Sequence, residues 1–430
     1  MYTPQRLFGE VGSSSEILSH EPFLERARLQ REREQDASAR LAMGAYLMAR
    51  LVDKLLTLQV GSEGAEGFCW QLEAVRRHVG DLPDDYPETA HLNGVVSAIP
   101  ESGLPTPSLW KSLTAYAYYL EHEGRLEESL EALTLAVRSH GSRLASADFV
   151  PYALLAGRLN RLLARWDPAT VCYQAALEAA SHNGDSNRAL RARLGRAHVD
   201  RARGNLPRAR KEIEQVISEA AEADLSDVQS DAQLDLGVVL MLQGSRAESL
   251  QATYNAFRLS QDAISRMRIL GDLGYALNES GYYSASRVAL EIVAESDSSY
   301  LIKLNAILEL MQLESAVGNR VAFERRRQQA RPLAGRMTPS MAVDYRYKTA
   351  VGLARFEQVE RAFEVAREAL ALAEQHHLNE WYFRVERMLQ ALESPPIREA
   401  DLTAPAEADA TPAVLEMTSG LREYASLTAV

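Results

Sequence analysis

The sequence predicts an all-α protein: a right-handed α-solenoid of about seven helical hairpins, with an N-terminal helical region before it and a C-terminal capping helix after it. The 430 residues are rich in Ala, Leu, Glu and Arg, which favour helices, and only 7% are aromatic. In the stretch 269–294, two apolar helix faces flank Gly281. A single hairpin buries only one of these faces, and similar hairpins recur at near-constant spacing, which is typical of a stacked repeat.

The repeat is clearest in the residues that end the first helix of each hairpin. These are Gly124, Ala164, Gly204, Gly244, Gly281, Gly318 and Glu357, with separations of 40, 40, 40, 37, 37 and 39 residues. Seven places earlier stand Ala117, Gly157, Ala197, Gly237, Gly274, Met311 and Ala350. Five places later stand Ser129, Ala169, Ala209, Ser249, Ser286, Phe323 and Ala362. Twelve places later stand Ala136, Ala176, Val216, Ala256, Val293, Ala330 and Ala369. Small residues at such fixed offsets let helices cross closely.

This pattern resembles the tetratricopeptide repeat (TPR) family, whose units of about 34 residues carry small residues at equivalent positions. The resemblance covers residues 108 to 393. The units here are longer and lack the Pro that ends the family's repeat. In this they are similar to the long-unit helical repeats in the sensor regions of bacterial transcription regulators and in peptide-responsive phosphatase regulators. The resemblance is specific for the fold and says almost nothing about function.

Composition and turn residues divide the chain into four parts. Residues 1–21 are expected to be a flexible N-terminus. Residues 22–100 form an N-terminal helical region in which 22 to about 59 reads as one helix, and Gly44 leaves open whether this region holds a degenerate repeat. After the prolines near residue 100, the repeat occupies 108–393 and includes a capping helix over 379–393. Residues 394–430, rich in Pro, Ala and acidic side chains, read as a disordered tail whose last stretch suits a short amphipathic segment.

Charge and cysteine usage exclude several classes of function. The net charge of −12 argues against non-specific binding to nucleic acid. The two cysteines, Cys69 and Cys172, lie far apart and lack metal-ligand spacing, which fits a reducing cytoplasm. The sequence has no signal-peptide pattern and no apolar run long enough to span a bilayer, so we expect a cytoplasmic protein without a membrane partner.

No motif in the sequence indicates catalysis, a metal or a cofactor, so we do not expect an enzyme. The glycines of GSEGAEG are accompanied by Glu63 and Glu66, which would repel a phosphate. The acidic stretch DLPDDYPE lacks the spacing of a calcium loop. The short His, Glu and Arg clusters at 121–123, 376–377 and 325–327 read as exposed faces or helix ends, and Trp166 and Trp381 as packing between helices.

The resemblance places ligands along the first helices of the hairpins. The family's groove positions correspond here to Arg158, Arg161, Arg191, His198 and Arg201, and further along to Asp235, Asp272, Tyr275, Asn278, Glu309 and Gln312. One half of the groove would then be basic and the other acidic, which suits an extended peptide with opposite charges at its ends. The alternative interpretation is that these are ordinary surface residues. The cationic set that clamps chaperone tails in some members of the family is missing.

The leading hypothesis is therefore a scaffold or adaptor that binds a peptide or helical segment of a protein partner in this groove. A second hypothesis is a regulator that responds to a peptide or small ligand. A third is a structural subunit of a larger complex, in which another chain covers the apolar face of Leu41 to Leu56. The partner and the oligomeric state are left open.

Overall fold

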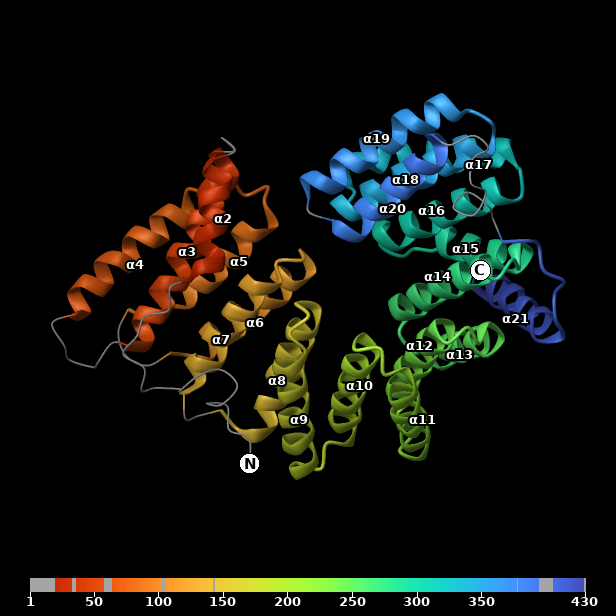
Figure 1. Ribbon diagram of the computed structural model, residues 1–430. Coiled ribbons are helices and arrows are strands. Elements are labelled where there is room, and N and C mark those ends of the chain that lie inside the picture. Colours follow the sequence, from red (N-terminus) through yellow and green to blue (C-terminus); the bar gives the residue numbers. More distant parts are fainter. Residues whose placement is uncertain are drawn as a thin grey trace. The chain divides into compact units, whose positions relative to one another are not determined.

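The computed structural model describes residues 20–32, 36–57, 64–101, 105–141, 144–376, 378–393 and 405–428, and the elements of these residues are helices with no strand (Figure 1). The first helices are α2 (Glu21–Glu32), α3 (Asp36–Thr57), α4 (Gly64–Gly80), α5 (Pro87–Ala98), α6 (Pro107–His122), α7 (Leu126–His140), α8 (Ser146–Leu162), α9 (Trp166–His182), α10 (Ser186–Ala202) and α11 (Leu206–Glu222). Those that follow are α12 (Ser226–Leu242), α13 (Arg246–Leu259), α14 (Ala263–Glu279), α15 (Tyr283–Glu295), α16 (Tyr300–Ala316), α17 (Arg320–Ala330), η2 (Arg331–Arg336), α18 (Pro339–Arg355), α19 (Val359–Gln375), α20 (Asn379–Glu393) and α21 (Pro412–Thr428). The predicted all-α repeat of helical hairpins is confirmed.

The chain forms two compact units, residues 1–212 and 213–430, which we call unit 1 and unit 2. The boundary falls within α11, inside the predicted repeat. The prolines near residue 100 separate α5 from α6, and these two helices share one core in unit 1, where Leu92 and Val96 are buried in the same cluster as Leu109 and Leu113.

The residues predicted to end the first helices adopt the conformation that such an ending requires. All seven have positive φ, from 56° at Ala164 to 81° at Gly244. This left-handed conformation lets the chain leave one helix and begin the next after a short turn, and glycine adopts it at the lowest energetic cost. Ala164 and Glu357 adopt it despite their Cβ atoms.

The rows of small residues lie where the helices of each hairpin cross. Ala117, Ala197 and Ala350 have no solvent exposure, and the rows five and twelve places after the turn are also buried. Three hairpins repeat one hydrogen bond of 2.7 Å across the crossing. The hydroxyl of the second helix donates to a carbonyl of the first, and the pairs are Ser129 with Ala117, Ser249 with Gly237, and Ser286 with Gly274. The small side chains therefore allow close approach, and the serines bond across it.

The N-terminal helices differ from the sequence prediction in two ways. The single helix expected over 22 to about 59 is two helices, α2 and α3, because α2 folds back and buries Phe23 and Ala27. The third hypothesis predicted that another chain covers the apolar face of Leu41 to Leu56. This face is instead covered within unit 1, where Leu41, Leu51 and Leu55 are each at most 5% exposed.

The expectation of a flexible N-terminus is also corrected at its end. His20 is buried between Asp53 on α3 and Glu131 on α7, whereas residues 1–19 lie outside the described residues.

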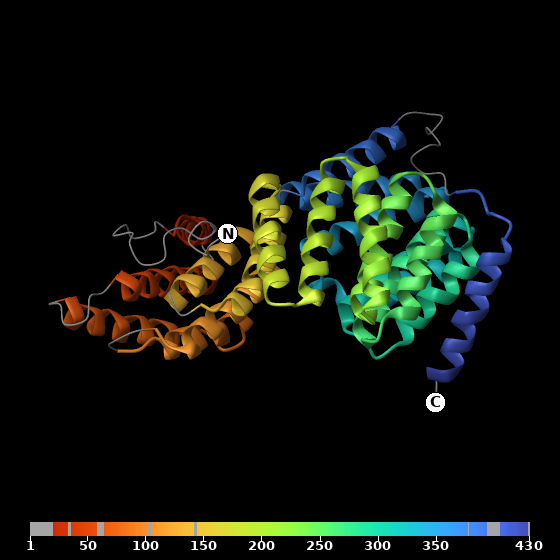
Figure 2. The same ribbon diagram turned by 90° about the horizontal axis from the view of Figure 1, so that it is seen from below.

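Unit 2 ends in two helices that pack on the repeat. The capping helix α20 covers the range expected for it, and it contributes Val385 and Met388 to the core of α18 and α19. Disorder was predicted for residues 394–430, but 412–428 form α21, and residues 394–404 lie outside the described part. The helix lies alongside α15 (Figure 2) and buries Val414, Met417 and Leu421 there. No helix in the described residues is long and apolar enough to cross a membrane.

Candidate functional site

The predicted groove residues all lie on first helices of hairpins. In unit 1, Arg158 and Arg161 are on α8, and Arg191, His198 and Arg201 are on α10. Most of these side chains already interact within the protein. Arg158 donates to Glu121 at 2.6 Å and Arg191 donates to Asn187 at 3.0 Å, and Arg161 hydrogen-bonds to Tyr173. The contact with Glu121 neutralises the charge of Arg158 and weakens it as an anion site, whereas Asn187 and Tyr173 are uncharged partners.

In unit 2, three of the predicted residues meet in one cavity. Asp272 and Tyr275 on α14 and Glu309 on α16 line a hollow of about 220 Å³ between these two helices. We call this hollow the acidic pocket. Its described lining comprises Met267, Arg268, Gly271, Asp272, Tyr275, Leu290, Ile302, Asn305, Ala306 and Glu309. Asp235, on α12, and Gln312 lie outside this lining.

Asp272 stands in surroundings that disfavour its charge. The residue is exposed to solvent, and the protein around the hollow replaces part of its hydration. This burial raises the pKa of Asp272 to about 6, and the nearby Glu309 carboxylate raises it further, whereas Arg268 lowers it. A cationic partner stabilises a carboxylate in such a position more strongly than it stabilises a fully solvated carboxylate.

Glu309 uses only part of its capacity to accept hydrogen bonds. Lys348 on α18 donates to its Oε1 at 2.7 Å and also donates to Asp344 at 2.8 Å. The Oε2 of Glu309 is buried and has no hydrogen-bond partner among the described residues. One lysine thus serves two carboxylates, and a further donor at Glu309 would satisfy an acceptor that is costly to leave unpaired.

Aromatic side chains extend this face across α18 and α20. Arg384 lies 4.8 Å from the ring centre of Tyr347 and 5.2 Å from that of Trp381, and Trp381 donates to Ser340 at 3.0 Å. Tyr275, which is 45% exposed, interacts electrostatically with both Arg384 and Lys348. First helices from successive hairpins therefore share one polar surface with aromatic anchors.

Two predicted residues are placed differently by the structure. Asn278 is 3% exposed and faces the core, so it is not available as a groove contact. Gln312 is half-buried, with its Oε1 unpaired among the described residues. The equivalent residues of the next two hairpins, Ser315 and Ala354, are buried as well, whereas Arg161 and Arg201 at the same position of earlier hairpins are half-buried.

The sequence analysis missed Arg268 and Asn305, which line the acidic pocket, and Asp344 and Lys348, which lie beside Glu309. The signal for them was present. Arg268 and Asn305 occupy the first groove position of their hairpins, and Asp344 and Lys348 occupy groove positions of the last hairpin. The same arithmetic that found Asp272 would therefore have found all four.

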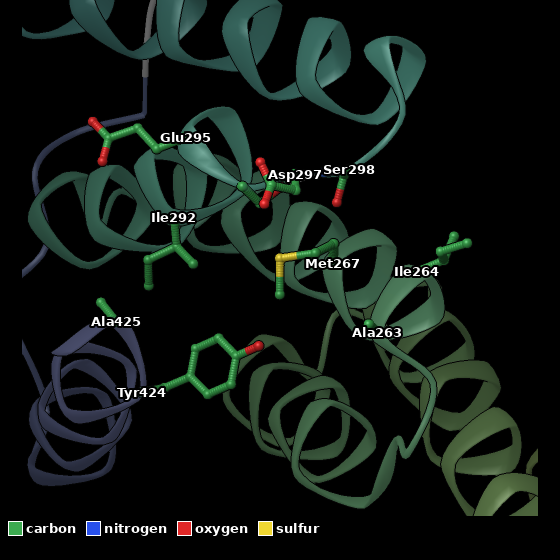
Figure 3. Close-up of a pocket in the computed structure, with 10 residues that line it drawn as sticks. Ala263, Ile264, Met267, Ile292, Glu295, Asp297, Ser298, Tyr424 and Ala425 are labelled. Carbon is green, nitrogen blue, oxygen red and sulfur yellow. Dashed lines mark hydrogen bonds between the residues drawn. The ribbon is translucent and has the colours of Figure 1, made fainter. Parts of the chain in front are cut away.

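A second cavity adjoins the acidic pocket along α14. It has a volume of about 510 Å³, and Met267 lines both cavities. In Figure 3, the ring of Tyr424 on α21 and the side chains of Met267 and Ile292 face the same space, with Glu295 and Asp297 at its rim. We call it the Tyr424 pocket. Its walls are mostly apolar, in contrast to the acidic pocket.

The described residues contain no cluster of three or more His, Cys, Asp or Glu side chains arranged to hold a metal. Cys69 is exposed, whereas Cys172 is buried, and burial raises the pKa of the Cys172 thiol to about 12. The two pockets offer charged side chains in one case and mostly apolar side chains in the other.

Comparisons with known proteins return structural likeness only. No protein-family model matches the chain, and no curated protein matches its sequence. A Rap protein complexed with competence and sporulation factor is 9% identical, with 84% of this chain and 98% of that chain covered and a TM-score of 0.45. The Rap conjugation gene regulator of plasmid pLS20 in complex with the Phr* peptide is 12% identical, with 81% and 96% covered and a TM-score of 0.44. The apo quorum sensor NprR from B. thuringiensis is 13% identical, with 84% and 99% covered and a TM-score of 0.41. At these values the likeness is too general to inform function.

Proposed function

We propose that this chain is a peptide-binding adaptor, and that unit 2 holds an extended peptide with a basic group in the acidic pocket. The single observation that carries the proposal is the arrangement of Asp272 and Glu309, two carboxylates that line one hollow, one of which has an oxygen without a hydrogen-bond partner among the described residues. An ammonium or guanidinium group would bond to both and would relieve their mutual repulsion.

The neighbouring side chains suit a peptide better than a small ion. Tyr275 offers an exposed aromatic face beside the pocket, and Asn305 offers an amide for the backbone of a ligand. Trp381 and Tyr347 flank Arg384 further along the same surface. Aromatic anchors beside a charged pocket are the features that carry most of the affinity in peptide interfaces.

Fluorescence anisotropy with labelled pentapeptide pools tests the proposal. The central residue is fixed as Arg, Gln or Glu, and the other four positions are random. We expect the Arg pool to bind at pH 7.5 about tenfold or more tightly than the Gln pool, since a charge-assisted hydrogen bond contributes about 1.5–3 kcal/mol. The Glu pool should not bind.

Variants locate the binding. Asp272→Asn with Glu309→Gln should abolish the preference for Arg. The matched control is Glu360→Gln, which removes one exposed carboxylate from the second helix α19. Equal binding of the Arg and Gln pools to the wild-type protein would contradict the proposal, and so would an Arg preference that survives the double substitution.

A further inference from the structure

The C-terminal helix α21 completes a cavity that the repeat alone would leave open. Tyr424 and Ala425 of α21 form one wall of the Tyr424 pocket, and Ile264 and Met267 of α14 belong to its other walls. The end of α15 contributes Ile292. The cavity therefore exists in this form only while α21 is docked.

The docking of α21 is specific. The ring of Tyr424 meets that of Phe257 edge to face at 5.2 Å, and Arg266 lies 5.8 Å from the centre of the Tyr424 ring. Before the helix, the backbone N–H of Ala408 donates to the carbonyl of Gly281 at 3.1 Å, and the Tyr283 hydroxyl donates to the carbonyl of Pro405. The segment that leads into α21 is thus fixed at the turn between α14 and α15, which positions the helix in unit 2.

The two pockets follow one another along α14 and share Met267 as a lining residue. The Tyr424 pocket is lined by Ala263, Ile264 and Met267, and the acidic pocket by Met267, Asp272 and Tyr275. From Ala263 to Tyr275 the helix rises about 18 Å at 1.5 Å per residue. An extended peptide covers that length with about five residues.

We propose that the Tyr424 pocket is the apolar subsite of the same ligand: a peptide whose basic group lies at Asp272 and Glu309 places an apolar side chain between Met267 and Tyr424. This inference rests on the proposed function and specifies its ligand. Ile264 and Asp272 are eight residues apart on α14, about 12 Å along the helix, which equals about three to four residues of extended backbone. Because the long basic side chain of the ligand spans part of this distance, the apolar residue can lie two or three positions from the basic one.

The character of the cavity supports an apolar side chain on a peptide that is basic overall. Met267, Ile292 and the Tyr424 ring present carbon and sulfur to the space, so an aliphatic side chain there leaves water for an apolar surface. The rim carries the exposed carboxylates Glu295 and Asp297, and the described lining includes no cation. An acidic ligand would be repelled at this rim.

The test uses the full chain and two pentapeptide pools with a central Arg. In one pool the first and last residues are Leu, and in the other they are Ser, so that either orientation of the peptide is covered. The wild-type protein should bind the Leu pool about tenfold more tightly than the Ser pool, as expected for the burial of one aliphatic side chain in a partly open cavity. Hydrogen exchange over 412–428 should also slow when the Leu pool binds.

Tyr424→Ala should reduce the Leu-over-Ser preference to below about twofold and leave binding of the Ser pool unchanged. Tyr424→Phe should keep the preference, because the ring and not the hydroxyl forms the wall. Leu415→Ala, at an exposed residue of α21 that lines neither pocket, is the matched control and should behave like the wild type.

The outcomes separate the two proposals. Equal binding of the Leu and Ser pools to the wild-type protein, or a preference that persists in Tyr424→Ala, would overturn the apolar subsite and leave the peptide-binding function standing. Failure of both Arg pools to bind the wild-type protein would overturn the subsite and the proposed function together.

Discussion

Lys348 on α18 donates a hydrogen bond of 2.7 Å to Glu309 on α16, and this lysine also holds Asp344. The side chain of Lys348 is 10% exposed and that of Glu309 is 18% exposed, so the contact is largely removed from water. It ties two hairpins of unit 2 together directly beside the acidic pocket. The second oxygen of Glu309 is buried and has no hydrogen-bond partner in the described part of the chain.

The first prediction concerns the structural contribution of Lys348. Replacement of Lys348 by Met should lower the free energy of unfolding by about 3 kcal/mol, because it leaves two partly buried carboxylates without their shared cation. Denaturant titration followed by circular dichroism measures the loss. Lys303→Met on α16 is the control and should change stability by less than about 0.5 kcal/mol. Similar stability of the two variants would show that the ion pair does not hold the hairpins together.

The second prediction concerns the pH dependence that Asp272 confers on stability. Its pKa in the folded protein is about 6, compared with an ordinary value of 3.8. Below pH 4 the group is protonated in both the folded and the unfolded state, so its ionisation does not change the free energy of unfolding. Above pH 6 it is charged in both, and folding bears the cost of a poorly solvated charge, so stability falls as pH rises through this range. Asp272→Asn should therefore raise the thermal midpoint at pH 7.5 and leave it unchanged at pH 3.5. A lower midpoint for the variant at pH 7.5 would contradict this.

The third prediction concerns ligand binding at the same residue. A cationic peptide is held by the charged form of Asp272, so its affinity should increase as pH rises from 5 to 7.5, through the pKa of about 6. The central-Arg pool measured by anisotropy across this range gives the profile. In Asp272→Asn the rise should be smaller, with the remainder due to Glu309, whose pKa burial also raises. A wild-type profile without a rise would mean that Asp272 does not contact the basic group.

The fourth prediction concerns the turns. Ala164 has φ of 56° at a position where five of the seven hairpins have glycine. Ala164→Gly should raise stability by up to about 1 kcal/mol, because relief of the left-handed strain outweighs the added chain entropy of glycine. The reverse substitution, Gly244→Ala, should lower stability by about 1 kcal/mol. Thermal melts of the two variants test both substitutions. Equal shifts of the thermal midpoint in the same direction would contradict the strain explanation.

The fifth prediction concerns a hairpin that breaks the small-residue rule. Phe323 occupies a position that is small in the six other hairpins, and it is fully buried. Its ring fits because Gly352 on α18 has no side chain. A Cβ at Gly352 would lie only 2.3 Å from the Phe323 ring. Gly352→Ala should therefore cost about 1–3 kcal/mol through overpacking. Gly271→Ala, where a Cβ meets no atom within 4 Å, is the control and should not destabilise.

The hairpins could be predicted from the sequence because their signals are local and repeated. Small residues at fixed sequence distances from Gly244 or Gly281 indicate where the two helices of one hairpin cross, and seven copies make the pattern unambiguous. The left-handed turn at each copy follows from the same rows. The site was predictable in part for the same reason, since Asp272, Tyr275 and Glu309 occupy repeated positions on first helices.

Contacts between distant segments were not predictable from these signals. The apolar face of α21, with Val414, Met417 and Leu421, indicates that this helix packs somewhere, but an amphipathic pattern does not specify which surface receives it. The pairing of Lys348 with Glu309 likewise joins residues of two hairpins. The charged residues within one helix do not show which residue of another hairpin will pair with a given lysine. The return of α2 onto α3 is a contact of the same kind.

The most direct test of the central claim is to map where a basic peptide binds. A pentapeptide with a central Arg, Leu at its first position and a photoreactive benzoylphenylalanine at its last is cross-linked to the full chain and located by mass spectrometry. We predict cross-links concentrated in residues 263–275 and 302–312, and their loss when Asp272→Asn is combined with Glu309→Gln. Cross-links that lie outside these residues and α21, or that persist unchanged in the double variant, would contradict the assignment of this surface as the peptide site.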